Sequence, residues 1–160
     1  KLRSRELVGL RSIDPTLALE KNTWFHLDSN AGEQMLYGLK RIAVPCFDHL
    51  DNGFSPLPDD LVDELKMVSA QTVGYFEKAL QTYRGTETEV KALTAEIEEY
   101  KNQLSALRKK HLDRLTTMTA QDAMTLPQQT AWLYLNILQE SQQLLSELRH
   151  YLRAYNHFCS

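Results

Sequence analysis

Glu147 and His150 are the residue pair whose types and spacing come closest to metal chemistry in this sequence of 160 residues. A glutamate and a histidine three residues apart lie on one face of a helix. Di-iron and di-manganese helical bundles use two such motifs, together with a glutamate from each of two further helices. This sequence contains one copy. We therefore favour a polar pair on a solvated helix face and keep a di-metal enzyme as the third-ranked hypothesis.

An acidic cluster is the second candidate for metal binding. Its members are Asp59, Asp60, Asp63 and Glu64. Asp59 and Asp63 are four residues apart, so on a helix their carboxylates share a face and can hold a divalent metal ion. In the first turns of a helix, the same carboxylates also complement the positive end of its dipole, by about 0.3–1 kcal/mol each at low salt. We favour the dipole interpretation and keep Asp59 and Asp63 as candidate metal ligands.

The remaining reactive side chains form no recognisable catalytic pattern. The five histidines are His26, His49, His111, His150 and His157, and none belongs to an HExxH motif. His111 lies on an apolar seam, where a hydrogen-bonded core histidine is the usual explanation. The two cysteines, Cys46 and Cys159, lack metal-type spacing, and we interpret them as reduced thiols in a cytosolic setting. With no P-loop, GxGxxG or GxSxG motif either, the sequence predicts a protein that is not an enzyme, and a divalent metal ion is its one candidate cofactor.

Four long segments with helical periodicity carry these side chains. Helices are predicted over about 29–50, from Pro58 to near Gly85, over 87–118, and from Pro127 almost to the C-terminus. Short connections between long helices make neighbours antiparallel. The predicted fold is therefore all-α, an antiparallel up-down bundle of four long helices with an irregular N-terminal segment. Residues 1–27 are assigned to a linker with a short helical segment and residues 28–160 to the bundle domain.

Each predicted helix has a seam of residues spaced three and four apart, as expected for a face turned toward neighbours. In the first it comprises Leu36, Leu39, Ala43, Cys46 and Leu50; in the second, Leu61, Leu65, Val68, Thr72, Tyr75 and Ala79, with a further stripe of Phe76, Leu80 and Tyr83. In the third it comprises Val90, Leu93, Ile97, Tyr100, Leu104 and Leu107, then His111 before a shift to Leu112 and Leu115; in the fourth, Tyr134, Leu138, Ser141, Leu145, Leu148, Leu152 and Tyr155.

Local signals refine the ends of these helices. Asp14-Pro15 is typical of a helix start, here predicted as a short turn through Glu20. Pro45 removes one backbone hydrogen bond, so we expect a kink or a break there. Thr86 and Glu89 form a capping box that opens the third helix.

The net charge of −3 gives the chain no general attraction to nucleic acid. Its longest apolar run, Ala131–Leu135, is far shorter than the roughly 20 residues that span a membrane. The sequence begins at Lys1, and we expect it to be a piece of a longer protein. If a membrane segment precedes it, the N-terminal basic residues would lie next to the membrane; these are Lys1, Arg3, Arg5 and Arg11.

The last predicted helix reads, from Trp132, WLYLNILQESQQLLSELRHYLRAYNHF. Together with the four-helix organisation and the acidic start of the second helix, this resembles the soluble PhoU-like domain attached to Pit-type inorganic phosphate permeases, over roughly residues 28–159. The resemblance implies a regulatory domain on the cytoplasmic side of the inner membrane. Such a domain would act by docking to the permease part of the same polypeptide or to a signalling protein.

PhoU-like proteins also carry a carboxylate-x-x-x-Asp motif that holds metal ions, and Asp59-x-x-x-Asp63 has this spacing. The resemblance therefore adds two further expectations, the sensing of a divalent metal ion and the sensing of inorganic phosphate. The alternative function is a generic helical-bundle module that scaffolds a signalling complex. A homodimer fits both functions, because long helices with such seams associate readily.

Overall fold

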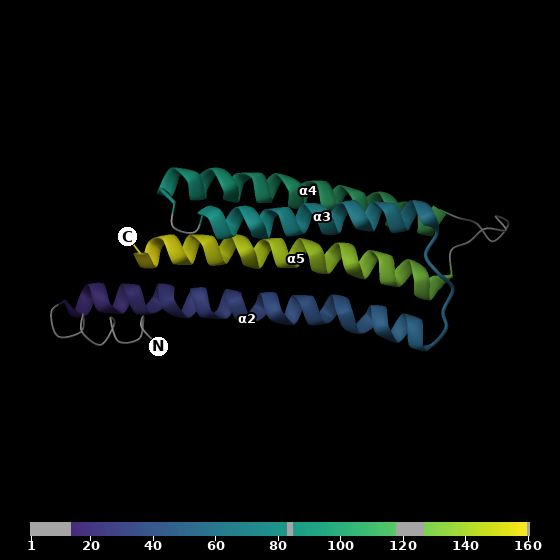
Figure 1. The fold of residues 1–160 in the computed structure, drawn as a ribbon, viewed down its shortest axis with the longest axis horizontal. Helices are drawn as coiled ribbons and strands as arrows, with labels where there is room; N and C mark the ends of the chain where they lie inside the picture. Colours follow the sequence, from purple (N-terminus) through teal and green to yellow (C-terminus); the bar gives the residue numbers. More distant parts are fainter. Residues whose placement is uncertain (1–13, 83–84, 118–126, 160) are drawn as a thin grey trace.

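The computed structural model describes residues 14–82, 85–117 and 127–159. These residues form four helices: α2 (Pro15–Asp51), α3 (Asp59–Thr82), α4 (Glu87–Thr117) and α5 (Gln128–Cys159), with no strand in these three ranges. The helices run alternately up and down (Figure 1). The predicted all-α antiparallel bundle is confirmed. None of the described helices has an apolar stretch long enough to cross a membrane.

The helices are not arranged evenly around a common axis. Figure 1 shows α5 lying between α2 on one side and the α3–α4 pair on the other. α5 packs against all three other helices, whereas the backbone of α2 contacts only α5. α2 is therefore an edge helix with one neighbour within the described chain.

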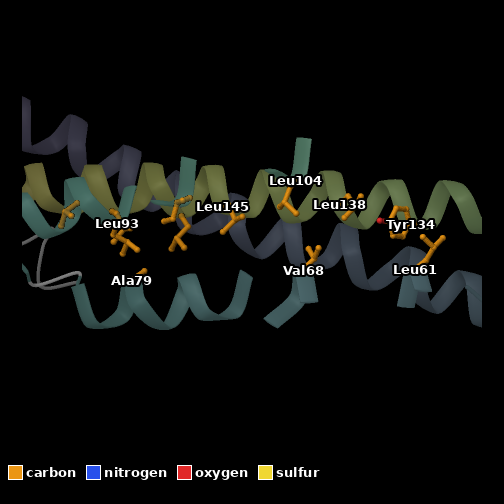
Figure 2. Packing of buried hydrophobic residues seen from close by; sticks show 12 residues of the cluster. Leu61, Val68, Ala79, Leu93, Leu104, Tyr134, Leu138 and Leu145 are labelled. Atoms are coloured by element: carbon orange, nitrogen blue, oxygen red, sulfur yellow. The ribbon is translucent and has the colours of Figure 1, made fainter. Parts of the chain in front are cut away.

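The core lies where α3, α4 and α5 meet (Figure 2). Its most completely buried large side chains include Tyr134, Leu138, Leu145 and Leu152 of α5 and Ile97 and Leu104 of α4. The seams predicted for the third and fourth helices are thus confirmed as the interior. On α3, Leu61, Val68, Thr72 and Ala79 are buried as predicted.

The outer parts of two predicted stripes do not enter this core. Leu80 of α3 is exposed, because the helix meets α4 and α5 on the Val68–Ala79 side only. Leu112 of α4 is also exposed, while His111 before it is buried. Tyr83 lies outside the described residues, as do the side chains of Leu115 and Met118.

α2 begins much earlier than the predicted first helix. Asp14 caps it, since its Oδ1 accepts hydrogen bonds from the backbone N–H groups of Thr16 and Leu17, both at 3.0 Å. The helix does not stop at Glu20 but continues to Asp51, so the expected irregular structure is wrong for residues 15–27. The division predicted at residue 28 falls inside this continuous helix. Residues 1–13, with the basic stretch, lie outside the described part of the chain.

The helix also continues through Pro45, where a kink or a break is predicted; no break occurs. Proline at this position leaves the carbonyl of Arg41 without the N–H group that would normally bond to it. The side chain of Asn136, on α5, donates a hydrogen bond to that carbonyl oxygen at 3.3 Å. The neighbouring helix therefore replaces part of the bonding that the proline removes.

The start of α4 agrees with the prediction. The backbone N–H of Thr86 donates to Glu89 Oε2 at 2.6 Å, and the backbone N–H of Glu89 donates to Thr86 Oγ1 at 3.3 Å. This is the reciprocal pattern of a capping box. The first turn of α4 is thereby fixed where the chain turns from α3.

Candidate functional site

Asp59 and Asp63, the predicted metal ligands, lie in the first turns of α3 with their side chains exposed. Asp63 Oδ1 accepts a hydrogen bond from Lys66 Nζ at 2.9 Å, and this bond raises the pKa of the Lys66 ammonium. Across the described ranges, no three His, Cys, Asp or Glu side chains gather where they could hold a metal ion. The two carboxylates therefore do not fit a closed metal site, and their place at the helix start matches the dipole interpretation.

Glu147 and His150 line a groove of about 620 Å³ between α2, α4 and α5. His150 Nδ1 lies 3.8 Å from Glu147 Oε2, and Gln143 Nε2 donates to Glu147 Oε1 at 2.6 Å. His150 is exposed. This is the expected polar pair at a solvated surface, and the residues that line the groove include no second Glu-x-x-His motif.

The other groups in this groove largely satisfy one another. Lys91 Nζ lies 2.6 Å from Glu87 Oε1, and the ring of His157 stacks on Trp24 with centroids 4.4 Å apart. The lining carries both signs of charge, with Arg153 added to these residues. The groove therefore selects no single charge type of ligand.

Two of the described histidines, His49 and His111, are buried, and each lies close to an oxygen atom of another residue. His111 Nε2 lies 2.9 Å from Glu64 Oε2, and the hydroxyl of Tyr134 donates a hydrogen bond to the same carboxylate oxygen. His49 Nε2 lies 2.9 Å from the carbonyl oxygen of Ser55. The core role predicted for His111 is confirmed, and Glu64 belongs to this cluster between α3, α4 and α5.

The side of α2 that faces α5 is built mainly from small and polar residues. Its buried residues are Ala18, Asp28, Ala31, Gly38 and His49. A Cβ atom at Gly38 would lie only 2.7 Å from Leu144 Cδ2, so glycine permits this close approach. Two large residues of α2 do contribute, since Met35 packs against the core and Trp24 stacks on His157 of α5. Most large apolar residues in the second half of the helix are exposed instead.

Those large residues lie on the opposite side, in the second half of the helix. We call this surface the outer face of α2: Leu36, Leu39, Ala43, Val44, Phe47 and Leu50. All six side chains are exposed, with Leu36, Phe47 and Leu50 at 69%, 65% and 73%. The prediction that this seam faces a neighbouring helix is therefore wrong for Leu36, Leu39, Ala43 and Leu50. The small residues that do face α5, such as Gly38 and Ala31, do not stand out in the sequence as a buried face.

The outer face differs from the other exposed apolar residues of the bundle in its continuity. Leu36, Leu39, Ala43, Phe47 and Leu50 follow one another at intervals of three and four, and Val44 is three before Phe47, so they are neighbours on the helix surface. The large exposed apolar residues of α3 are Met67, Val73 and Leu80, which are separated by six and seven positions, with exposed Ala70 between the first two. Scattered single side chains are normal on a protein surface, whereas a contiguous patch marks a site of interaction.

Polar contacts hold the middle of α2 firmly on α5. Arg41 Nε donates to Glu140 Oε2 at 2.7 Å, and Glu140 is buried. Asn136, one turn before Glu140 on α5, bonds to the carbonyl of the same arginine. These contacts fix the orientation of the helix, so its outer face points consistently away from α5.

Cys46 lies beside this face and is half-buried, and burial raises the pKa of its thiol. The raised pKa favours the protonated, unreactive thiol at neutral pH. Cys46 forms no disulfide with another described residue, as expected for a reduced thiol. The side chain of Cys159 lies outside the described residues.

The groove and the outer face of α2 are two surfaces to which a function can be assigned. Comparison of the chain with models of known protein families, with characterised proteins and with solved structures gives no match in any of the three.

Proposed function

We propose that this chain is a regulatory docking domain, of the PhoU-like kind, that serves a Pit-type inorganic phosphate permease. It works by binding a protein partner through the outer face of α2 and carries out no catalysis. In this proposal the domain lies on the cytoplasmic side of the membrane that contains the permease.

The outer face is the observation that carries the proposal. Apolar surface in water is unfavourable by about 25 cal/mol per Å², so a helix with apolar residues on both sides is stabilised by a second neighbour. α2 has α5 on one side and no other described helix on the other. α5 and the four-helix organisation resemble domains attached to phosphate permeases. This resemblance is the reason for proposing that docking through this surface regulates a permease.

The experiment compares two leucines that are equally exposed. Leu50 on the outer face and Leu80 on α3 are each 73% exposed. Leu50→Glu and Leu80→Glu are introduced into the full-length protein, and phosphate uptake by intact cells is measured together with protein level. We expect Leu50→Glu to change the uptake rate, because a buried carboxylate disrupts docking, and Leu80→Glu to leave it unchanged.

Equal uptake with both variants, at equal protein level, would contradict the proposal. A full-length protein without any membrane segment would also contradict it and would favour the scaffold module. Thermal unfolding of both variants provides the folding control, and we expect the same melting temperature for each.

A further inference from the structure

We propose that a second copy of this chain covers the outer face of α2, with the two α2 helices antiparallel and the two-fold axis passing beside Ala43. The inference rests on the proposed function and deepens it, because it names a second copy of this chain as the protein partner that the outer face binds. A two-fold interface requires one patch that complements itself. The order of side chains along the outer face meets this requirement.

Residues at equal distances from Ala43 match in character. Leu36 and Leu50 are each seven residues from Ala43, which is two helical turns, and Leu39 and Phe47 are each four residues away. In an antiparallel pair centred on Ala43, Leu36 meets Leu50 of the second copy, and Leu39 meets Phe47 of the second copy. Four of the large apolar side chains of the outer face thus meet one another across the axis, and Val44, next to Ala43, lies outside this pattern.

The centre of the seam is occupied by the smallest side chain in it. Ala43 is exposed, and it is flanked along the seam by Leu39 and Phe47. An alanine at the crossing point allows two helices to approach to the lower end of the usual 8–10 Å spacing. The larger residues on either side then interdigitate one turn away from the axis.

The charges select the antiparallel arrangement over the parallel one. Lys40 is exposed within the outer face, and Asp48 is exposed on the flank of α2 that lines a hollow with the start of α5. Neither forms an ion pair with another described residue. In the antiparallel register, Lys40 lies about 3 Å along the axis from the level of Asp48 of the second copy, within reach of its side chain. A parallel pair in register would instead place lysine beside lysine and aspartate beside aspartate.

The surface is accessible to a second copy and limited in size. α2 is at the edge of the bundle, so no described helix blocks its outer side (Figure 1). The seam from Leu36 to Leu50 is about 21 Å long. This is short for an interface, since a stable complex commonly buries about 800 Å² on each partner. Pairing is therefore expected to depend on concentration.

The first test is a disulfide across the two-fold axis. Ala43→Cys is made in the full chain with Cys46→Ser and Cys159→Ser, and oxidation is followed by non-reducing electrophoresis over a series of protein concentrations. We expect covalent dimers to form at least tenfold faster than with Ser69→Cys, an exposed position on α3, in the same background. Equal rates for the two positions would overturn the proposal.

The second test uses charge reversal and sedimentation equilibrium. Lys40→Asp and Asp48→Lys alone should each raise the dissociation constant of the dimer at least tenfold, because each creates like charges twice in a symmetric pair. The double variant should recover most of the affinity, because it again places a lysine opposite an aspartate, with the two residues exchanged. No recovery would overturn the antiparallel register, and a monomer at every concentration would overturn the pairing itself.

These outcomes are separate from those of the uptake experiment. If the chain stays monomeric while Leu50→Glu changes phosphate uptake, the outer face binds a different partner and this inference fails alone. If the dimer forms as described while uptake is unaffected by Leu50→Glu, the pairing stands and the proposed function fails.

Discussion

α5 and α2 are helices of similar length in very different surroundings. α5 lies between α2 and the α3–α4 pair, and its buried residues point in several directions, as Leu133, Leu138 and Leu144 illustrate. α2 touches only α5 and does so through residues such as Ala31 and Gly38. Large apolar side chains therefore stabilise the fold on α5, whereas on the outer face of α2 they remain available for a partner.

The largest expected effect tests this difference directly. Leu145→Ala on α5 should lower the free energy of unfolding by about 2–5 kcal/mol, because the side chain is fully buried and its loss leaves a cavity. Leu104→Ala on α4 should have a comparable effect, for the same reason. Leu36→Ala on α2 should change it by less than about 0.5 kcal/mol, as for other surface substitutions. Urea unfolding at low protein concentration, where the chain is monomeric, measures all three.

A cost at Leu36 similar to that at Leu145 would show that the outer face is part of the folded interior. The comparison between the two helices would then be invalid, and with it the assignment of a docking surface.

The same contrast explains which parts of the fold can be predicted from the sequence. The seam of α5 is predictable because Tyr134, Leu138 and Leu145 are large and apolar at positions that are buried. On α2 the period of three and four predicts a seam, but its direction depends on whether small residues pack against a neighbour. Leu144, which fills the space above Gly38, is more than a hundred positions away in the chain, and no local pattern links the two.

The second prediction concerns the close approach of α2 and α5. Gly32→Ala, also on α2, meets no atom within 4 Å and should raise the free energy of unfolding by up to about 1 kcal/mol through helix propensity. Gly38→Ala should lack this gain, because its new Cβ would press on Leu144. We expect the second variant to be less stable than the first by about 1–3 kcal/mol, the usual cost of overpacking.

The glycine pair can be measured by thermal or urea unfolding under identical conditions. Equal stabilisation by both substitutions would mean that α2 can move away from α5 at no cost, and that the outer face is not held in a fixed orientation.

The third prediction concerns Pro45 and Asn136, which connect the same two helices. Asn136→Ala should lower the free energy of unfolding by about 0.5 kcal/mol, at the low end for a hydrogen bond because the contact is partly exposed. In a Pro45→Ala background the same substitution should cost almost nothing, since the restored N–H of residue 45 bonds to the carbonyl of Arg41. A double-mutant cycle measures this coupling. Identical costs in both backgrounds would show that Asn136 does not compensate for the proline.

The candidate surfaces were predictable to different degrees. The polar role of Glu147 and His150 follows from the presence of one motif rather than two, and the core role of His111 follows from its place on a seam. The groove lined by Trp24 and His157 could not be predicted from the sequence. It forms because α2 and α4 both pack on α5 but do not contact each other. The partnership of Glu64 with Tyr134 likewise joins residues on different helices without any shared local pattern.

The smallest expected effect concerns the charge of Glu89, the capping residue at the start of α4, and its contribution to stability. Hydrogen bonds from the backbone N–H and then the hydroxyl of Thr86 lower the pKa of the Glu89 carboxyl below its ordinary value. A carboxyl with a lowered pKa in the folded state contributes stability that is complete above its unfolded pKa, near 4.3, and is lost as the pH falls through the folded value. Glu89→Gln keeps a hydrogen-bonding side chain at this capping position but removes the charge. The variant should therefore lose stability relative to the parent at neutral pH, and the difference should shrink as the pH falls below about 4.3 and through the lowered pKa of the folded state. Glu99→Gln, an exposed glutamate later in α4, is the control for simple loss of charge. A difference between Glu89→Gln and the parent that stays constant from neutral to acid pH would mean that the cap acts by hydrogen-bond geometry alone and that its charge does not help to start α4.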